Sequence, residues 1–188
     1  MVEHTLTARP PLGGYRETFS DTQLEERADL VIVSVAVPLG GKAALNKTIA
    51  DAFGSTLPET GKITTSKDGS IRFLGMSPDQ IFILLDETET GSGQRVETAL
   101  EGSGYCTQQS DNWVKLRMAG TASLAALERI CPVDLDPVAF PEDRVARTVL
   151  EHMGAIILRE GADSFLLLSA ASSAGAFLDA VRESIIRL

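Results

Sequence analysis

Histidine, cysteine and aromatic residues are scarce in this sequence. Among its 188 residues there are two histidines (His4, His152) and two cysteines (Cys106, Cys131), and aromatic residues make up 5%. Two isolated histidines provide neither a clustered proton shuttle nor a metal centre. The cysteines lie far apart without Cys-x-x-Cys spacing, which excludes a zinc knuckle and a redox dithiol and favours buried thiols. The residues therefore predict no catalytic, cofactor-binding or metal-binding site in this chain.

Basic clusters and long apolar runs are also missing. The formal net charge is -9, so no basic face is available for a nucleic-acid partner. The longest apolar runs, 30–33 and 155–158, are far too short to cross a bilayer, and no charged-then-apolar leader opens the sequence. A composition of 44% hydrophobic and 23% charged residues is ordinary for a globular protein. We expect a cytoplasmic protein with no membrane contact.

The central stretch, 110–141, begins with a strand. Val114, Leu116 and Met118 alternate with polar or amphipathic residues, which is the period of a half-buried strand. Gly120 ends this strand. Thr121 is placed to accept a hydrogen bond from a free amide at the start of a helix.

A helix and a connector complete this stretch. Leu124, Leu127 and Glu128 return at helical spacing among alanines. Pro132 and Pro137 forbid regular continuation, so 132–141 is predicted to be an extended connector pinned to a surface of the domain.

The remaining periodicity predicts strands and helices in alternation. Expected before the central stretch are a strand at 30–37, a helix at 42–53 ending at Gly54, strands at 71–74 and 80–85, a helix at about 94–101 and a strand at 105–109. Expected after it are strands at 155–158 and 164–168 and a last helix capped by Ser172 or Ser173, while 144–151 is either a strand or a strained turn. Gly40-Gly41-Lys42 is a structural turn, because Ala36 and Ala43 break the phosphate-loop pattern.

These elements predict an α+β protein of two ferredoxin-like layers. We expect residues 29–188 to form a single compact domain of two similar halves, 29–109 and 110–188, preceded by an extended N-terminal arm, 1–28. The arm carries Tyr15 and Phe19 along an otherwise polar stretch. It is either a tail folded onto its own domain or a segment that orders on a partner chain.

The sequence also resembles a known family. The pattern Gly-x6-Leu-Glu-Arg-Ile-Cys-Pro-Val-Asp-Leu-Asp-Pro-x-Ala-Phe-Pro, 120–141, resembles the gamma subunit of heterotetrameric sarcosine oxidase. Further matching stretches cover nearly everything after residue 28; they include 35–41, 74–75, 78–80, 111–113, 146–148, 154–159, 165–169 and 172–178. The resemblance implies a fold like the folate-binding region of aminomethyltransferase proteins.

The resemblance implies a non-catalytic, structural subunit of an oxidoreductase complex. That family's complex, with alpha, beta and delta chains, oxidatively demethylates sarcosine to glycine, produces hydrogen peroxide, and passes the one-carbon unit to tetrahydrofolate or releases formaldehyde. FAD, FMN, NAD, tetrahydrofolate and zinc are then expected in the partner subunits, with alpha in direct contact with this chain. Candidate contact residues are Tyr15, Phe19, Trp113 and Phe140, although large aromatics can equally belong to the core.

A stand-alone folate-binding or aminomethyltransferase-like module is the alternative. It requires a pocket that stacks a pterin and a carboxylate near its amine, for which Asp111 is the candidate. Asp111 and Asp134 each lie beside a turn, however, where capping loop amides is the usual role of such residues.

Overall fold

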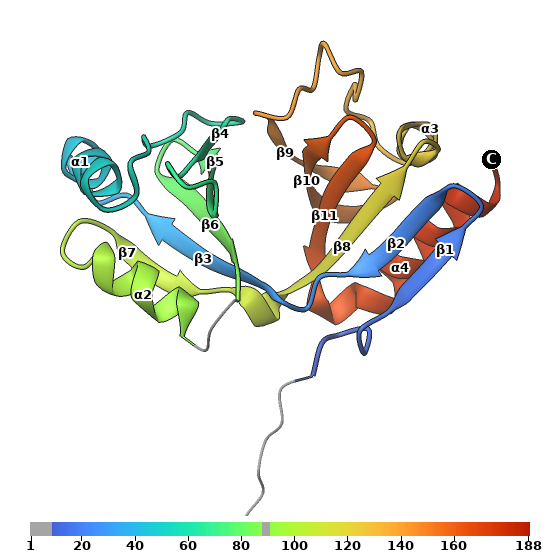
Figure 1. Cartoon of the computed structure of the whole chain (residues 1–188), viewed down its shortest axis with the longest axis horizontal. Coiled ribbons are helices and arrows are strands. Elements are labelled where there is room, and N and C mark those ends of the chain that lie inside the picture. Colours follow the sequence, from blue (N-terminus) through green and yellow to red (C-terminus); the bar gives the residue numbers. More distant parts are fainter. Residues whose placement is uncertain (1–8, 88–90) are drawn as a thin grey trace, which may run out of the picture.

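The protein, described by a computed structural model at residues 9–87 and 91–188, contains two antiparallel sheets with helices outside them (Figure 1). The first half supplies a five-stranded sheet and two helices. In chain order these are β3 (Leu30–Ala36), α1 (Lys42–Phe53), β4 (Ile63–Thr65), β5 (Ile71–Ser77), β6 (Gln80–Asp86), α2 (Ser92–Ala99) and β7 (Tyr105–Gln108).

The second half and the N-terminal segment together build a six-stranded sheet. Their elements are β1 (Arg16–Phe19), β2 (Thr22–Glu26), a 3-10 turn η1 (Ser110–Asn112), β8 (Trp113–Gly120), α3 (Ser123–Glu128), β9 (Val145–Leu150), β10 (Met153–Gly161), β11 (Ser164–Ala170), η2 (Ala171–Ser173) and α4 (Ala174–Ile186).

The two sheets have equivalent strand orders. One runs β4-β5-β6-β3-β7 and the other β9-β10-β11-β8-β2-β1. β8 corresponds to β3, and β2 stands where β7 stands in the first half. The ferredoxin-like repeat predicted from the sequence is confirmed, but the last strand of the second half is β2, which comes from the N-terminal segment and precedes β8 in the chain.

Local sequence accounts for most of these elements. β3 is rich in β-branched residues and is buried along nearly its whole length, as expected for a strand covered on both faces. The helix predicted over 42–53 is α1, and Gly54 ends it in the left-handed region at φ 63°. Within the segment 144–151 the strand β9 runs from Val145 to Leu150, and the turn that follows begins at Glu151, whose φ is 54°. α2 begins at Ser92, two residues before the predicted start.

Three apolar cores give the molecule four layers. α1 and α2 cover the outer face of the first sheet, around Leu45, Ile49 and Val96, and α3 and α4 cover the outer face of the second. The inner faces pack against each other through apolar residues of both sheets: Leu30, Ile32, Leu74, Met76, Phe82, Leu84, Val145, Ile156, Leu158, Leu166 and Leu168. We call the contact between these inner faces the seam.

β8 corrects one prediction about exposure. Val114, Leu116 and Met118 are buried toward α3 and α4, as the alternation predicts. The opposite face was expected to be open, yet Trp113 packs in the seam and Lys115 is only 5% exposed. Period-two alternation cannot show that a second sheet covers the polar face.

Two capping predictions also differ from the structure. The Thr121 hydroxyl donates to Asp21 rather than accepting from an amide of α3, whose N-terminus has no side-chain cap. Ser173 is at the N-cap of α4 as predicted, but its hydroxyl donates to the Ala170 carbonyl at 3.1 Å. In both cases a nearby oxygen from outside the helix is the better partner.

The connector 132–141 is pinned as predicted. Leu135 is fully buried and Phe140 is 5% exposed, and both belong to the core beneath α3 and α4. Burial of these two side chains holds an otherwise irregular segment on the second half.

Candidate functional site

A charged cleft of about 390 Å³ opens at the seam. Its charged lining residues come from both halves: Arg27, which precedes β3, Arg72 on β5, Asp86 on β6, Arg117 on β8 and Glu160 on β10.

The charged side chains of this cleft form ion pairs with one another. Glu160 Oε1 lies 2.6 Å from Arg72 Nη1, and Glu160 Oε2 lies 3.1 Å from Arg117 Nε. Arg27 Nη2 lies 2.6 Å from Asp86 Oδ1. Arg72 and Glu160 belong to different halves, so their pair joins the two sheets. Partly buried guanidinium-carboxylate pairs of this kind position the elements that carry them.

Arg27 also binds Asp29 through two hydrogen bonds of 2.9 Å each. This bidentate pairing raises the pKa of Arg27 and lowers the pKa of Asp29. Both groups therefore stay charged and paired near neutral pH, and neither acts as a proton donor or acceptor there.

Lys115 also links the two halves. Its Nζ donates to the Leu30 carbonyl at 2.9 Å and to the Ser110 carbonyl at 3.4 Å. Burial lowers the pKa of Lys115, while Asp111 and other acidic groups act against that shift. Asp111, the candidate carboxylate for a folate amine, is exposed and lines a pocket of about 330 Å³ together with Lys115.

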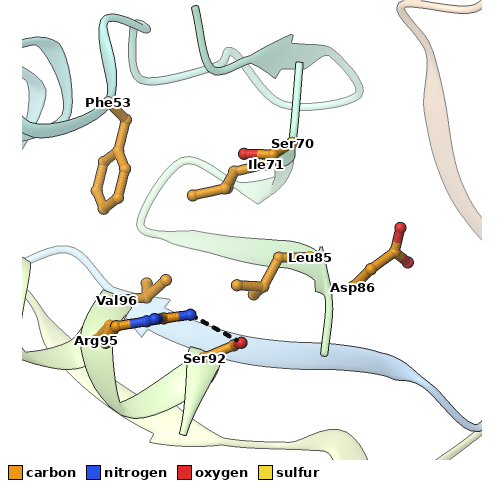
Figure 2. A pocket seen from close by; sticks show the side chains of 8 residues that line it. All are labelled: Phe53, Ser70, Ile71, Leu85, Asp86, Ser92, Arg95 and Val96. Carbon is orange, nitrogen blue, oxygen red and sulfur yellow. Dashed lines mark hydrogen bonds between the residues drawn. The ribbon is translucent and has the colours of Figure 1, made fainter. Parts of the chain in front are cut away.

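A second, more apolar pocket of about 300 Å³ lies over the first half (Figure 2). Phe53, Ile71, Leu85 and Val96 point into it from α1, β5, β6 and α2. At its lower margin Arg95 donates to the Ser92 hydroxyl at 3.2 Å. Asp111, the predicted carboxylate, does not line this pocket; the carboxylate that does is Asp86, which is paired with Arg27 at 2.6 Å.

The predicted contact residues Tyr15 and Phe19 lie on the second half of their own chain. Both pack against its core, and the Arg182 guanidinium of α4 lies 5.9 Å from the Phe19 ring centroid. Burial and a hydrogen bond to Glu17 raise the pKa of Tyr15 to about 12. The hydrogen bond from Arg182, at 2.8 Å, is the main cause that lowers the pKa of Glu17 to about 2.

Trp113 and Phe140, the other two predicted contact residues, lie in cores. Trp113 meets Phe82 edge to face at 5.7 Å, and its buried Nε1 has no hydrogen-bond partner within the described part of the chain. Phe140 is almost fully buried, and its carbonyl accepts from Arg159 at 2.8 Å. An interface role stays a prediction for these two residues and for Tyr15 and Phe19.

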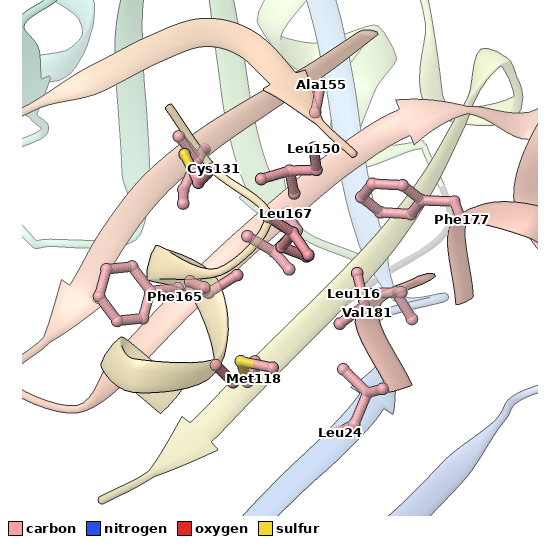
Figure 3. Packing of buried hydrophobic residues seen from close by; sticks show 14 of the residues in the cluster. Leu24, Leu116, Met118, Cys131, Leu150, Ala155, Phe165, Leu167, Phe177 and Val181 are labelled. Atoms are coloured by element: carbon pink, nitrogen blue, oxygen red, sulfur yellow. The ribbon is translucent and has the colours of Figure 1, made fainter. Parts of the chain in front are cut away.

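The other reactive side chains are dispersed. His152 is exposed, and Asp134 accepts from the amide of Asp136 at 3.0 Å, which is the loop-capping role expected for it. Cys131 is buried in the core of the second half (Figure 3), and Cys106 is half-buried. Burial raises the pKa of both thiols, so both stay protonated at neutral pH.

Metal-binding clusters and membrane-spanning helices were considered for residues 9–87 and 91–188, the part of the chain that the structure describes. No group of three or more His, Cys, Asp or Glu side chains in these ranges is arranged to hold a metal ion. None of the helices there has both the length and the apolar character needed to cross a membrane.

Sequence reasoning missed an exposed surface at one end of the first sheet. The side chain of Leu39 is fully exposed and that of Tyr105 is 71% exposed. For Leu39 a signal was available, since Pro38 and Gly40 flank it in a turn too short to bury it. Nothing local distinguishes Tyr105 from a core aromatic.

No protein-family model matches the chain. It is 30% identical, over 181 residues, to sarcosine oxidase subunit gamma of Corynebacterium sp. (strain P-1), with 92% of this chain and 87% of that protein aligned. It is 25% identical, over 173 residues, to sarcosine oxidase subunit gamma of Arthrobacter sp, with 89% of this chain and 85% of that protein aligned.

Solved structures share the fold. A chain of the heterotetrameric sarcosine oxidase from Corynebacterium sp. U-96, in complex with pyrrole 2-carboxylate, superposes with a TM-score of 0.75 at 24% identity, covering 88% of this chain and 84% of that one. Aminomethyltransferase T of the glycine cleavage system from Bartonella henselae superposes with a TM-score of 0.64 at 11% identity, covering 93% of this chain and 56% of that one. These likenesses confirm the predicted aminomethyltransferase-like α+β fold.

Proposed function

The chain belongs to the sarcosine oxidase subunit gamma family, and from that premise we propose that it is the gamma chain of a heterotetrameric sarcosine oxidase. The observation that carries the proposal is the extent of the likeness, which spans nearly the whole length of both chains in order. Similarity over a complete domain is more specific than a short motif, and more specific than a shared fold.

In this proposal the chain has a structural role. The assembled enzyme oxidatively demethylates sarcosine to glycine, with hydrogen peroxide and a one-carbon unit that goes to tetrahydrofolate or leaves as formaldehyde. The flavins, NAD, folate and zinc are held by the alpha, beta and delta chains. The ion pairs of the seam support this role, because Arg27, Arg72 and Arg117 are each engaged in holding this chain together.

Co-expression with the alpha, beta and delta chains tests the assignment. A tag on this chain is expected to retain the other three in stoichiometric amounts through affinity and size-exclusion steps. Failure to retain any of them would refute it.

The folate-binding alternative needs a separate measurement. Calorimetric titration of the isolated chain with tetrahydrofolate is expected to show no saturable binding at micromolar concentrations. Tight saturable binding would instead favour a folate-binding module and remove the structural role.

A further inference from the structure

The two sheets differ at one equivalent edge. β2 is paired on its outer side with β1, so the second sheet continues one strand further there. β7 holds the same position in the first sheet and is the last strand at that margin among the described residues (Figure 1). The repeat of the fold therefore shows that a strand in this position can carry another strand on its outer side.

The backbone of β7 is oriented to accept one. The Gln109 amide donates to the Ile32 carbonyl at 2.8 Å, which places this pair in the hydrogen-bonded phase of the ladder with β3. Hydrogen-bonded and non-hydrogen-bonded pairs alternate along an antiparallel ladder. The N–H and C=O groups of Cys106 and Gln108 therefore point away from β3, and no hydrogen bond from the described part of the chain reaches them.

A groove of about 310 Å³ runs beside this edge. Gln94, Glu97 and Thr98 on one face of α2 form its wall, and Cys106 lines the β7 side. Glu101, Gly102 and Gly104, from the segment between α2 and β7, complete the lining. Glu97 lies near enough to contribute to the raised pKa of Cys106. The lining contains two carboxylates and no basic side chain, so it attracts a cationic group.

Exposed apolar side chains lie at one end of the same edge. Tyr105 is 71% exposed and pairs with Ala36, so it sits where β3 leads into the turn that carries the fully exposed Leu39. Exposed apolar side chains at one end of a sheet are typical of protein contact surfaces, where tyrosine supplies much of the binding energy.

We propose that the outer edge of β7 binds an extended segment of a larger subunit as an additional antiparallel strand. A Lys or Arg of that segment lies over Glu97 and Glu101, and an apolar residue of it contacts Tyr105. This inference rests on the proposed function, since it requires assembly with larger chains. Main-chain hydrogen bonds supply affinity in such strand addition, and the side-chain contacts supply specificity.

Proline substitution tests the strand addition. Cys106→Pro removes one outward N–H while leaving the ladder with β3 intact, because an edge strand tolerates proline where its N–H faces outward. Cys106→Ala is the matched control, which alters the side chain and keeps the amide. In pull-downs from cells that co-express the larger subunits, Cys106→Pro is expected to weaken retention at least tenfold, and Cys106→Ala is expected to behave as wild type.

Charge reversal tests the groove independently. The pair Glu97→Lys with Glu101→Lys is expected to weaken retention several-fold, since it places positive charge opposite a cationic partner residue. Retention of both the proline and the charge-reversal variants at wild-type level overturns the inference. Loss of retention by the wild type itself overturns the proposed function instead, so the two failures are distinguishable.

Thiol footprinting resolves the case in which Cys106→Pro does not fold. Alkylation of wild-type Cys106 with iodoacetamide, read by peptide mass spectrometry, is expected to be at least tenfold slower in the complex than in the isolated chain. Cys131 is 8% exposed and serves as the slow internal reference in both states. Equal Cys106 rates in the two states, or protection in a self-dimer of the isolated chain seen by light scattering, overturn the inference.

Discussion

Arg159 provides the sharpest test of how this chain is held together. It lies on β10, is 3% exposed, and directs its guanidinium at the backbone of the connector 132–141. Nε donates to the Phe140 carbonyl at 2.8 Å, Nη1 to the Ala162 carbonyl at 2.5 Å, and Nη2 to the Leu135 carbonyl. The guanidinium also lies 4.5 Å from the Phe165 ring centroid. One side chain thus binds three carbonyls, two in the connector and one in the turn that follows β10.

Replacing Arg159 by Met keeps much of the side-chain volume and leaves these carbonyls without a donor. A hydrogen bond from a charged group contributes about 1.5 kcal/mol at the lower end of its range, so three of them give about 4 to 5 kcal/mol. Removing a buried charge offsets part of this loss. We expect the free energy of unfolding to fall by about 3 to 4 kcal/mol, a large share of the roughly 5–15 kcal/mol typical of a domain.

Urea unfolding measures this change. Trp113 is the only tryptophan and is packed in the seam, so its fluorescence reports loss of the packed structure. Arg147→Met on the exposed side of β9 is the matched control and is expected to stay within about 0.5 kcal/mol of wild type. Arg159→Lys is expected to fall between the two, because an ammonium group does not reach three carbonyls at once. A loss below about 1 kcal/mol for Arg159→Met would refute the reasoning.

Three further perturbations have defined outcomes. In a Tyr105→Phe variant the remaining tyrosine, Tyr15, is expected to ionise with a midpoint near 12 in an absorbance titration. Because this pKa is raised above the ordinary value of 10, the stability that Tyr15 contributes is present below pH 10 and is lost as the pH rises through 12. A midpoint near 10 would show that the N-terminal arm does not fold onto the second half. The pKa of Lys115 is lowered in the folded chain, so the unfolded chain binds more protons at this residue. Denaturant titrations at several pH values should therefore show the free energy of unfolding of the wild type rising relative to that of Lys115→Met as the pH approaches 10.5. A difference that stays constant with pH would contradict the lowered pKa. A Cβ on Gly120 would lie 1.9 Å from the Asp21 carbonyl oxygen, so Gly120→Ala should lower the thermal midpoint. A Cβ on Gly175 in α4 would meet nothing within 4 Å, so Gly175→Ala should raise the thermal midpoint, with a gain of about 0.5–1 kcal/mol in the free energy of unfolding. Equal effects of the two substitutions would contradict this difference in packing.

Local patterns were sufficient for most individual elements. The β-branched run of β3 and the amphipathic run of α1 ending at Gly54 depend on neighbours within one turn or one strand, so sequence periodicity predicts them. The position of β2 was beyond such reasoning. Its residues alternate like those of any short edge strand, and only the three-dimensional repeat shows that it completes the sheet of the second half.

The contacts of the charged residues in the seam could not be predicted from the sequence either. Arg72 and Glu160 are 88 positions apart, and Lys115 reaches a carbonyl 85 positions away. Each looks in sequence like an ordinary charged residue on the open face of a strand. Phe140 shows the converse limit, because an aromatic in a proline-rich connector suits a partner contact and a core anchor equally well, and here it is buried.

The proposed function makes this chain a structural member of a larger oxidase that does not act alone. The most direct measurement compares peroxide release from sarcosine by the purified chain, by the alpha, beta and delta chains together, and by all four. The account predicts no turnover by the single chain, and incorporation of that chain at one copy per complex with a gain in the complex's stability to heat. Peroxide release by the purified chain alone, or an oxidase that assembles and survives heating equally well without it, would contradict the account.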